Sequence, residues 1–235
     1  MNAIKKQARI AGLLYLLASI PAPFGLIYVP NKLIVLNDAT ATANHIRASE
    51  SLLRLGIASE LFASIVFILV VLALYRLFKA VNETHALAMT ILILVSIPIS
   101  LLSVVNEIAA LILVSGADFL SVFDKAQLDA LAYLFMRLHG RELLVAEIFW
   151  GLWLFPFGIL VIRSGFIPRV LGVLLIIAAF GYLASSVTFL LLPAYGPIVD
   201  KFATKLTLCE LPMILWLLIW GANVKPPAVV AASSQ

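Results

Sequence analysis

Four glutamates interrupt the long apolar stretches of this chain, at Glu60, Glu107, Glu147 and Glu210. A charged side chain at the centre of a bilayer costs about 2.5–3.5 kcal/mol on insertion scales, so such carboxylates are expected to face protein or water and to have partners. Each lies about five to ten residues from the same end of its stretch, which is roughly 7–15 Å at 1.5 Å per residue. We therefore expect the four carboxylates to occupy one layer of a helix bundle.

Further polar side chains are expected in or above this layer, at Arg54, Asn106, His139, Arg141 and Glu142. Three kinds of chemistry are compatible with the set. The glutamates could hold the bundle together through salt bridges and hydrogen bonds, or they could line an outward-facing cavity that binds a polar or cationic ligand or relays protons. They could also bind a metal ion with His139, because carboxylate and imidazole groups are ligands of hard and borderline metals.

The metal interpretation has the least support in the sequence. The chain has only three histidines and no HExxH motif, which is a frequent arrangement of zinc ligands on a helix. His45 and His85 are expected on opposite sides of the membrane. We therefore predict no metal site and assign no cofactor.

Recognisable catalytic motifs are absent from the sequence. There is no phosphate-binding glycine loop, no GxSxG and no paired-cysteine motif. This favours a non-enzymatic protein that binds or moves a small ligand through the polar layer. The alternatives are a membrane-embedded enzyme that uses a glutamate with His139, and a polar cluster that is purely structural.

The composition is that of a membrane protein. Of the 235 residues, 63% are hydrophobic and 12% are charged, whereas soluble domains are roughly 45–50% apolar and about 25% charged. The lysines and arginines flank apolar stretches, so the formal net charge of +4 reflects membrane topology and does not indicate nucleic-acid binding. The expected partners are the lipid bilayer and a small-molecule ligand, with a homo-oligomer left open. The single cysteine, Cys209, excludes an intramolecular disulfide.

The chain contains six apolar stretches of spanning length, given that a bilayer requires about 20 mostly apolar residues. They cover residues 10–30, 51–75, 86–114, 141–162, 170–192 and 205–222. The first contains two prolines and a glycine within residues 21–25, so we expect a kink or unwinding there. We predict an all-α polytopic membrane helix bundle with six transmembrane helices. We expect residues 1–222 to form one domain and residues 223–235 to form a short disordered cytoplasmic tail.

Residues 54–76 and 141–163 begin and end with arginine and share an internal glutamate at the same spacing of six and sixteen residues. This suggests three repeated helical hairpins, formed by spans one and two, three and four, and five and six. Six residues rotate a helix by about 240°, which directs each first arginine away from its own glutamate. We therefore expect Arg54 to pair with Glu147 of another hairpin.

Three long connections are expected on one side of the membrane. Residues 31–50 include a helix cap at Asn37 or Asp38, followed by a short helix. Residues 116–140 have apolar side chains at helical spacing after Asp124, so this segment either lies in the interface or extends the fourth span. Residues 193–204 form the third connection.

Four sequence segments resemble one known family. They are ARIAGLLYLL (8–17), FWGLWLFPFG (149–158), RSGFIPRVLGVLL (163–175) and ELPMILWLLIWG (210–221). Together they resemble a bacterial family of small integral membrane proteins described only as a domain of unknown function. The resemblance covers roughly residues 8–222. It implies a six-span α-helical protein of the bacterial cytoplasmic membrane, and it implies no activity, substrate or catalytic residue.

Both termini and the short connections near Arg76 and Arg163 are predicted on the cytoplasmic side. The basic cluster at residues 5–9 directly precedes the first span, and the basic residues of this side have few acidic neighbours. A reporter that is active only in the periplasm should therefore be silent when fused to the C-terminus. The same reporter inserted into residues 116–140 should be active, and the opposite pattern would reverse the predicted orientation.

Overall fold

The computed structural model describes residues 3–223, which contain helices and no strands. The helices are α1 (Ala3–Ser19), α2 (Pro21–Pro23), α3 (Val29–Leu33), α4 (Ala39–Ala48), α5 (Glu50–Phe78), α6 (Glu83–Val114), α7 (Lys125–Ser164), α8 (Arg169–Leu191), α9 (Gly196–Thr207) and α10 (Leu211–Ile219). Apart from Asn223, the predicted C-terminal tail lies outside the described residues.

Within residues 3–223, six helical segments are long and apolar enough to cross a bilayer. These segments are Ala3–Leu33, Glu50–Phe78, Glu83–Val114, Lys125–Ser164, Arg169–Leu191 and Pro193–Ile219. Large apolar side chains such as Leu102 and Phe180 point outward and are more than half exposed, as expected for a surface covered by lipid. The predicted all-α fold and its six spans are confirmed.

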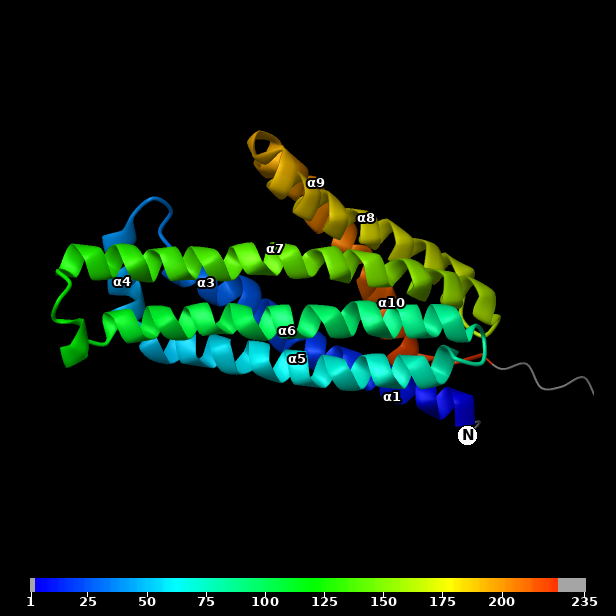
Figure 1. Ribbon diagram of the computed structural model, residues 1–235. Coiled ribbons are helices and arrows are strands. Elements are labelled where there is room, and N and C mark those ends of the chain that lie inside the picture. The colour runs from blue at the N-terminus through cyan, green and yellow to red at the C-terminus, as the bar shows by residue number, and fades with distance from the viewer. Residues whose placement is uncertain (1–2, 224–235) are drawn as a thin grey trace, which may run out of the picture.

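Helices α5, α6 and α7 run side by side along the length of the molecule (Figure 1). Helix α1 lies against α5, and α10 packs on α1. Helix α8 packs on the part of α7 from Arg141 onward, and α9 folds back along α8. In Figure 1, α8 and α9 leave the side of α7 at an angle. The first half of α7 therefore extends beyond the last hairpin.

The two ends of the described chain lie beside the two short connections. The guanidinium of Arg9 donates to the carbonyl oxygen of Ile219 over 2.8 Å, and this contact joins α1 to the end of α10. The amide of Asn223 donates to the carbonyl oxygen of Phe166 in the turn between α7 and α8, also over 2.8 Å. The ring of Phe166 stacks on Phe78, at the end of α5, with centroids 5.8 Å apart. The predicted grouping of both ends with the short connections is confirmed.

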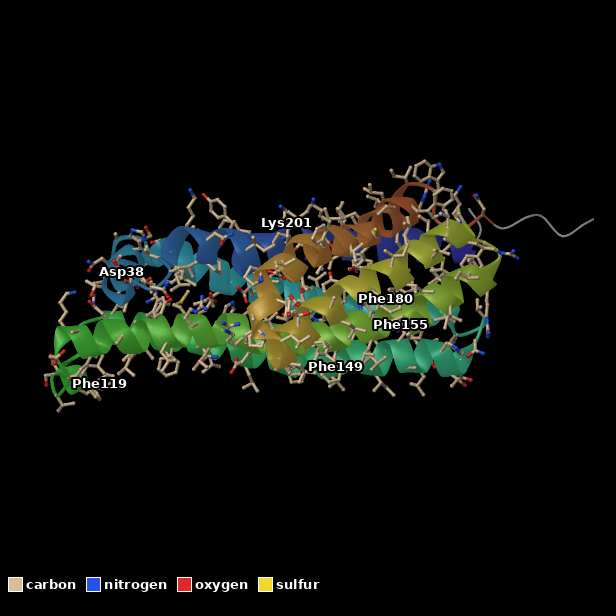
Figure 2. All side chains as sticks on the ribbon, turned by 90° about the horizontal axis from the view of Figure 1, so that it is seen from above. Asp38, Phe119, Phe149, Phe155, Phe180 and Lys201 are labelled. Carbon is tan, nitrogen blue, oxygen red and sulfur yellow. The ribbon has the colours of Figure 1, made fainter. Side chains whose placement is uncertain are left out.

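The first two long connections lie at the other end of the bundle, where Figure 2 shows Asp38 and Phe119. Asp38 is the cap of α4, because its carboxylate accepts from the amide of Ala41 over 2.8 Å. Asp124 caps α7 and forms a reciprocal capping box with Gln127. Helix α7 then continues without interruption to Ser164, so the segment after Asp124 extends the fourth span and does not form a separate interfacial helix.

The third long connection differs from the prediction. Most of residues 193–204 are helical, as a short turn at Pro193–Tyr195 followed by α9. Pro197 occupies the first turn of α9, where its missing amide hydrogen and fixed φ are compatible with a helix. The last span therefore begins at Pro193 and not near residue 205.

The first span is irregular where its prolines and glycine predicted a kink. Helix α1 ends at Ser19, and a π-helical segment, Phe24–Tyr28, follows α2. A π-helix has wider backbone hydrogen bonding than an α-helix and often occurs at functional sites. Gly25 lies inside this segment and faces Glu60 and Gly56 of α5.

Buried apolar side chains form two clusters along the bundle. The first core lies toward the short connections and includes Leu74, Trp153 and Phe157. The second core lies toward the long connections and includes Leu33 and Met136. The helices α5, α6 and α7 contribute to both cores, so a layer of these three helices lies between them.

Helices α7 and α8 come closest where two glycines face each other. A Cβ atom on Gly172 would lie 2.5 Å from the carbonyl oxygen of Gly158. Gly172→Ala is therefore expected to push the two backbones apart and to lower the free energy of unfolding by ~1–3 kcal/mol, as overpacking does in other cores. Thermal unfolding of the detergent-solubilised protein measures the change.

Gly140→Ala is the matched control for this substitution. Gly140 also lies within a long helix, but a Cβ atom there would meet no atom within 4 Å. Replacing a helix-interior glycine with alanine in open space should leave stability unchanged or raise it by ~0.5–1 kcal/mol. If both variants unfold at the same temperature, the close approach of α7 and α8 does not exclude a side chain at Gly172.

Candidate functional site

Three of the predicted site residues meet inside the bundle, and we call them the Glu–Glu–His centre. Glu60 comes from α5, Glu107 from α6 and His139 from α7. Each offers one ligand atom, and these three atoms lie within 4.8 Å of one another. The exposed fractions of the residues are 4%, 0% and 2%, so the centre is closed to bulk solvent.

The two apolar cores determine where these side chains meet. On each of the three helices, the polar residue lies between a residue of the first core and a residue of the second core. The flanking pairs are Leu53 and Val66 on α5, Ile93 and Ala110 on α6, and Met136 and Trp153 on α7. Apolar packing on both sides therefore fixes the three helices and leaves one polar layer between the cores.

The protonation of His139 follows from its neighbours. Its Nδ1 atom lies 3.2 Å from the carbonyl oxygen of Ser103, and a carbonyl can only accept a hydrogen bond. The proton is therefore on Nδ1, and in the neutral ring the lone pair of Nε2 faces the two carboxylates. Nε2 is 3.6 Å from Oε1 of Glu60 and 3.8 Å from Oε1 of Glu107.

Four buried polar atoms of these three side chains have no hydrogen-bond partner among the described residues. They are Oε1 of Glu60, both carboxylate oxygens of Glu107 and Nε2 of His139. The ion pairs of the described residues also give neither glutamate a lysine or arginine partner. Burying an unpaired polar or charged group is costly. The centre therefore needs either protons on its carboxylates or a positive charge that these side chains do not supply.

The π-helical segment of the first span closes one side of the centre. A Cβ atom on Gly25 would lie 2.5 Å from Cγ of Glu60 and 2.8 Å from the carbonyl oxygen of Gly56. Only glycine therefore allows this backbone to lie against the Glu60 side chain. Through this contact, the irregular part of the first span fixes the position of one of the two carboxylates.

Glu210 lies elsewhere and has partners. The hydroxyl of Tyr15 on α1 donates to its Oε1, and the hydroxyl of Tyr182 on α8 lies 3.2 Å from its Oε2. Both carboxylate oxygens thus accept hydrogen bonds from different helices. This arrangement connects α1, α8 and the start of α10, and it is typical of a structural role.

Glu147 also lies outside the centre. It is half-buried, close enough to Asp200 and Tyr182 for electrostatic interaction, and its Oε2 has no hydrogen-bond partner among the described residues. The predicted Arg54–Glu147 pair is wrong. The guanidinium of Arg54 is 64% exposed and pairs over 2.6 Å with Glu50, one turn earlier on the same helix.

The other predicted site residues make contacts near the centre but not in it. Asn106 donates to Glu142 over 2.8 Å, which joins α6 to α7. The guanidinium of Arg141 stacks over the ring of Phe189 on α8, 3.9 Å from the ring centroid. The nine candidates therefore do not line one cavity, and the four glutamates do not converge. The three-hairpin repeat stays a prediction, although Glu60 and Glu147 have different surroundings.

Several residues of these sites were not predicted. Tyr15 and Tyr182 could have been noticed, because a hydroxyl inside an apolar span usually finds a hydrogen-bond partner. Ser103 acts through its backbone carbonyl, for which a side-chain pattern gives no signal. Gly25 was recognised as a helix breaker but not as a neighbour of Glu60.

A family model described as "Domain of unknown function (DUF4386)" matches residues 10–221. The chain belongs to this family. The match includes residues of all six spans and confirms the resemblance found in the sequence. Comparison with curated proteins and with solved structures found no match. Family membership thus supports the fold and assigns no activity.

The tyrosines around Glu210 give a test of its structural role. Tyr15→Phe removes the hydroxyl that donates to Oε1, so a buried carboxylate oxygen loses its partner. The free energy of unfolding is expected to fall by ~1–3 kcal/mol. Tyr75→Phe is the control, because its hydroxyl makes only an exposed contact with Glu83, over 3.4 Å. Equal thermal unfolding of the two variants would contradict the structural assignment.

Proposed function

We propose that this membrane protein binds a small inorganic cation in the Glu–Glu–His centre. One observation carries the proposal: two buried carboxylates and an imidazole nitrogen face one another, and none of these atoms has a partner among the described residues. Ionisable residues within membrane spans usually pair with one another or mark an ion or proton pathway. A cation between the three groups supplies the missing opposite charge.

The spacing of the three groups favours a single ion over an organic cation. The ligand atoms are within 4.8 Å of one another, so they surround a space of roughly atomic size. The α5, α6 and α7 helices would each contribute one ligand, so a bound ion would connect three spans. Cation binding is therefore also expected to stabilise the bundle.

The proposal places the protein in the bacterial cytoplasmic membrane, with both termini in the cytoplasm. Its support is the resemblance to a bacterial family and the basic residues beside the short connections. In this orientation the long connections and α4 face the periplasm. The second core then lies between the centre and the periplasmic end of the bundle.

Thermal unfolding in detergent tests cation binding. The protein is first stripped with a chelator and then unfolded in Na⁺, K⁺, Mg²⁺, Ca²⁺, Mn²⁺ or Zn²⁺ chloride. At least one salt should stabilise the unmodified protein, by about 2.7 kcal/mol when the free ion is at 100 times its Kd. Glu107→Gln should abolish this effect, because it removes one of the two carboxylates that face the centre.

Glu147→Gln is the matched control, because it neutralises a glutamate that lies within a span but outside the centre. This variant should retain the stabilisation shown by the unmodified protein. The proposal fails if no salt stabilises the protein in a manner that depends on Glu107. That result would indicate a structural cluster whose carboxylates are neutralised by protons alone.

A further inference from the structure

We infer that the ion is a divalent transition-metal cation of the Zn²⁺ class, held by Nε2 of His139 and the carboxylates of Glu60 and Glu107. The inference rests on the proposed function above, since it names the class of cation that the same centre takes. No zinc motif is visible in the sequence, because the three ligands come from three helices and are 47 and 32 residues apart (107 − 60 and 139 − 107). Their proximity is visible only in the folded chain.

The charge of the centre favours a dication. Two carboxylates and a neutral imidazole carry a total charge of −2, and the described ion pairs bring no lysine or arginine to them. A divalent ion alone makes the buried centre neutral, whereas Na⁺ or K⁺ leaves one negative charge unless a carboxylate also takes up a proton. An uncompensated buried charge is strongly destabilising. A monovalent ion therefore fits the centre less well.

The orientation of His139 is that of a metal ligand. In metal sites, a ligating histidine usually donates its other ring N–H to a carbonyl or carboxylate, which fixes the tautomer and the ring orientation. Here the carbonyl oxygen of Ser103 accepts from Nδ1, and Nε2 faces the carboxylates with no partner among the described residues. An imidazole nitrogen is a good ligand for Zn²⁺, Fe²⁺ and related ions, whereas Mg²⁺ and Ca²⁺ prefer oxygen.

The distances also agree with such an ion. Zinc bonds of about 2.0–2.2 Å at tetrahedral angles separate neighbouring ligand atoms by roughly 3.3–3.6 Å. The separations from Nε2 to the two carboxylates are 3.6 and 3.8 Å, so these two pairs need shifts of only a few tenths of an ångström. These separations are longer than direct hydrogen bonds, which span about 2.7–3.2 Å. All three ligand atoms lie within 4.8 Å of one another.

The number of donors excludes a good calcium site. Four atoms of the three side chains have no hydrogen-bond partner among the described residues, namely one oxygen of Glu60, two of Glu107 and one nitrogen of His139. Zinc is usually four-coordinate, and Ca²⁺ takes about six to eight oxygen ligands. The centre is also closed to bulk solvent, which leaves few waters to complete a calcium shell.

Metal binding to the purified, chelator-stripped full-length protein tests the inference. Competition against a chromophoric chelator should give one Zn²⁺ per chain, bound more tightly than Mg²⁺ or Ca²⁺. His139→Gln replaces the nitrogen with an amide and should weaken Zn²⁺ binding at least as much as loss of an outer-shell partner does, by ~10–100-fold. The weak binding of Mg²⁺ should change little, because the amide oxygen suits a hard ion.

His45→Gln is the matched control, because His45 is exposed on α4 and lies away from the centre. This variant should leave the affinities for Zn²⁺ and for Mg²⁺ unchanged. Thermal unfolding without metal checks that each variant is folded. The absorption spectrum of the unmodified protein loaded with Co²⁺ gives a readout that needs no variant, and it should show the bands of a low-coordinate protein site.

The outcomes separate the two proposals. If Mg²⁺ or Ca²⁺ binds in a Glu107-dependent manner more tightly than Zn²⁺, the transition-metal inference fails and cation binding stands. A Co²⁺ spectrum identical to that of the hydrated ion, or Zn²⁺ affinity unaffected by His139→Gln in a folded variant, also overturns the inference. If no cation binds in a Glu107-dependent manner, both proposals fail.

Discussion

The burial of Glu60 and Glu107 without a lysine or arginine partner is the constraint on which the centre of this bundle depends. Their side chains are 4% and 0% exposed, and the described ion pairs bring them no lysine or arginine. A charge is tolerated in such surroundings only when an opposite charge or a proton compensates it. Apolar packing on both sides prevents the helices from separating to admit water, so compensation has to come from something small enough to fit among three side chains.

The same residue type serves different purposes in this chain according to its neighbours. Glu210 accepts hydrogen bonds from two tyrosines, and Glu142 accepts one from Asn106, so both are explained by the contacts between helices. Glu60 and Glu107 differ because the atoms that face His139 have no such donors among the described residues. A carboxylate in a membrane span therefore indicates a functional site only when its partners have been accounted for.

The partner expected for Arg54 shows why helical rotation alone does not predict which residue an arginine pairs with. Rotation correctly separated Arg54 from Glu60 on its own helix. However, Glu50 lies one turn before Arg54 on the same helix, is exposed beside it and forms its ion pair. A long, flexible arginine reaches a local partner at little cost in conformational entropy, whereas a partner on another helix requires both side chains to be buried. Within residues 3–223, no lysine or arginine therefore pairs with Glu60 or Glu107.

The sequence alone determined the all-α fold, the six spans, the grouping of both chain ends with the short connections and a helix cap at Asn37 or Asp38. These features depend on hydrophobic length and on contacts within a few residues, which a linear pattern records. It also identified Glu60, Glu107 and His139 as candidates, but together with six others that lie elsewhere. Only the tertiary structure decided which of them meet, because that depends on how α5, α6 and α7 are rotated and staggered against each other. Packing between helices distant in sequence determines those rotations, and no local pattern specifies them.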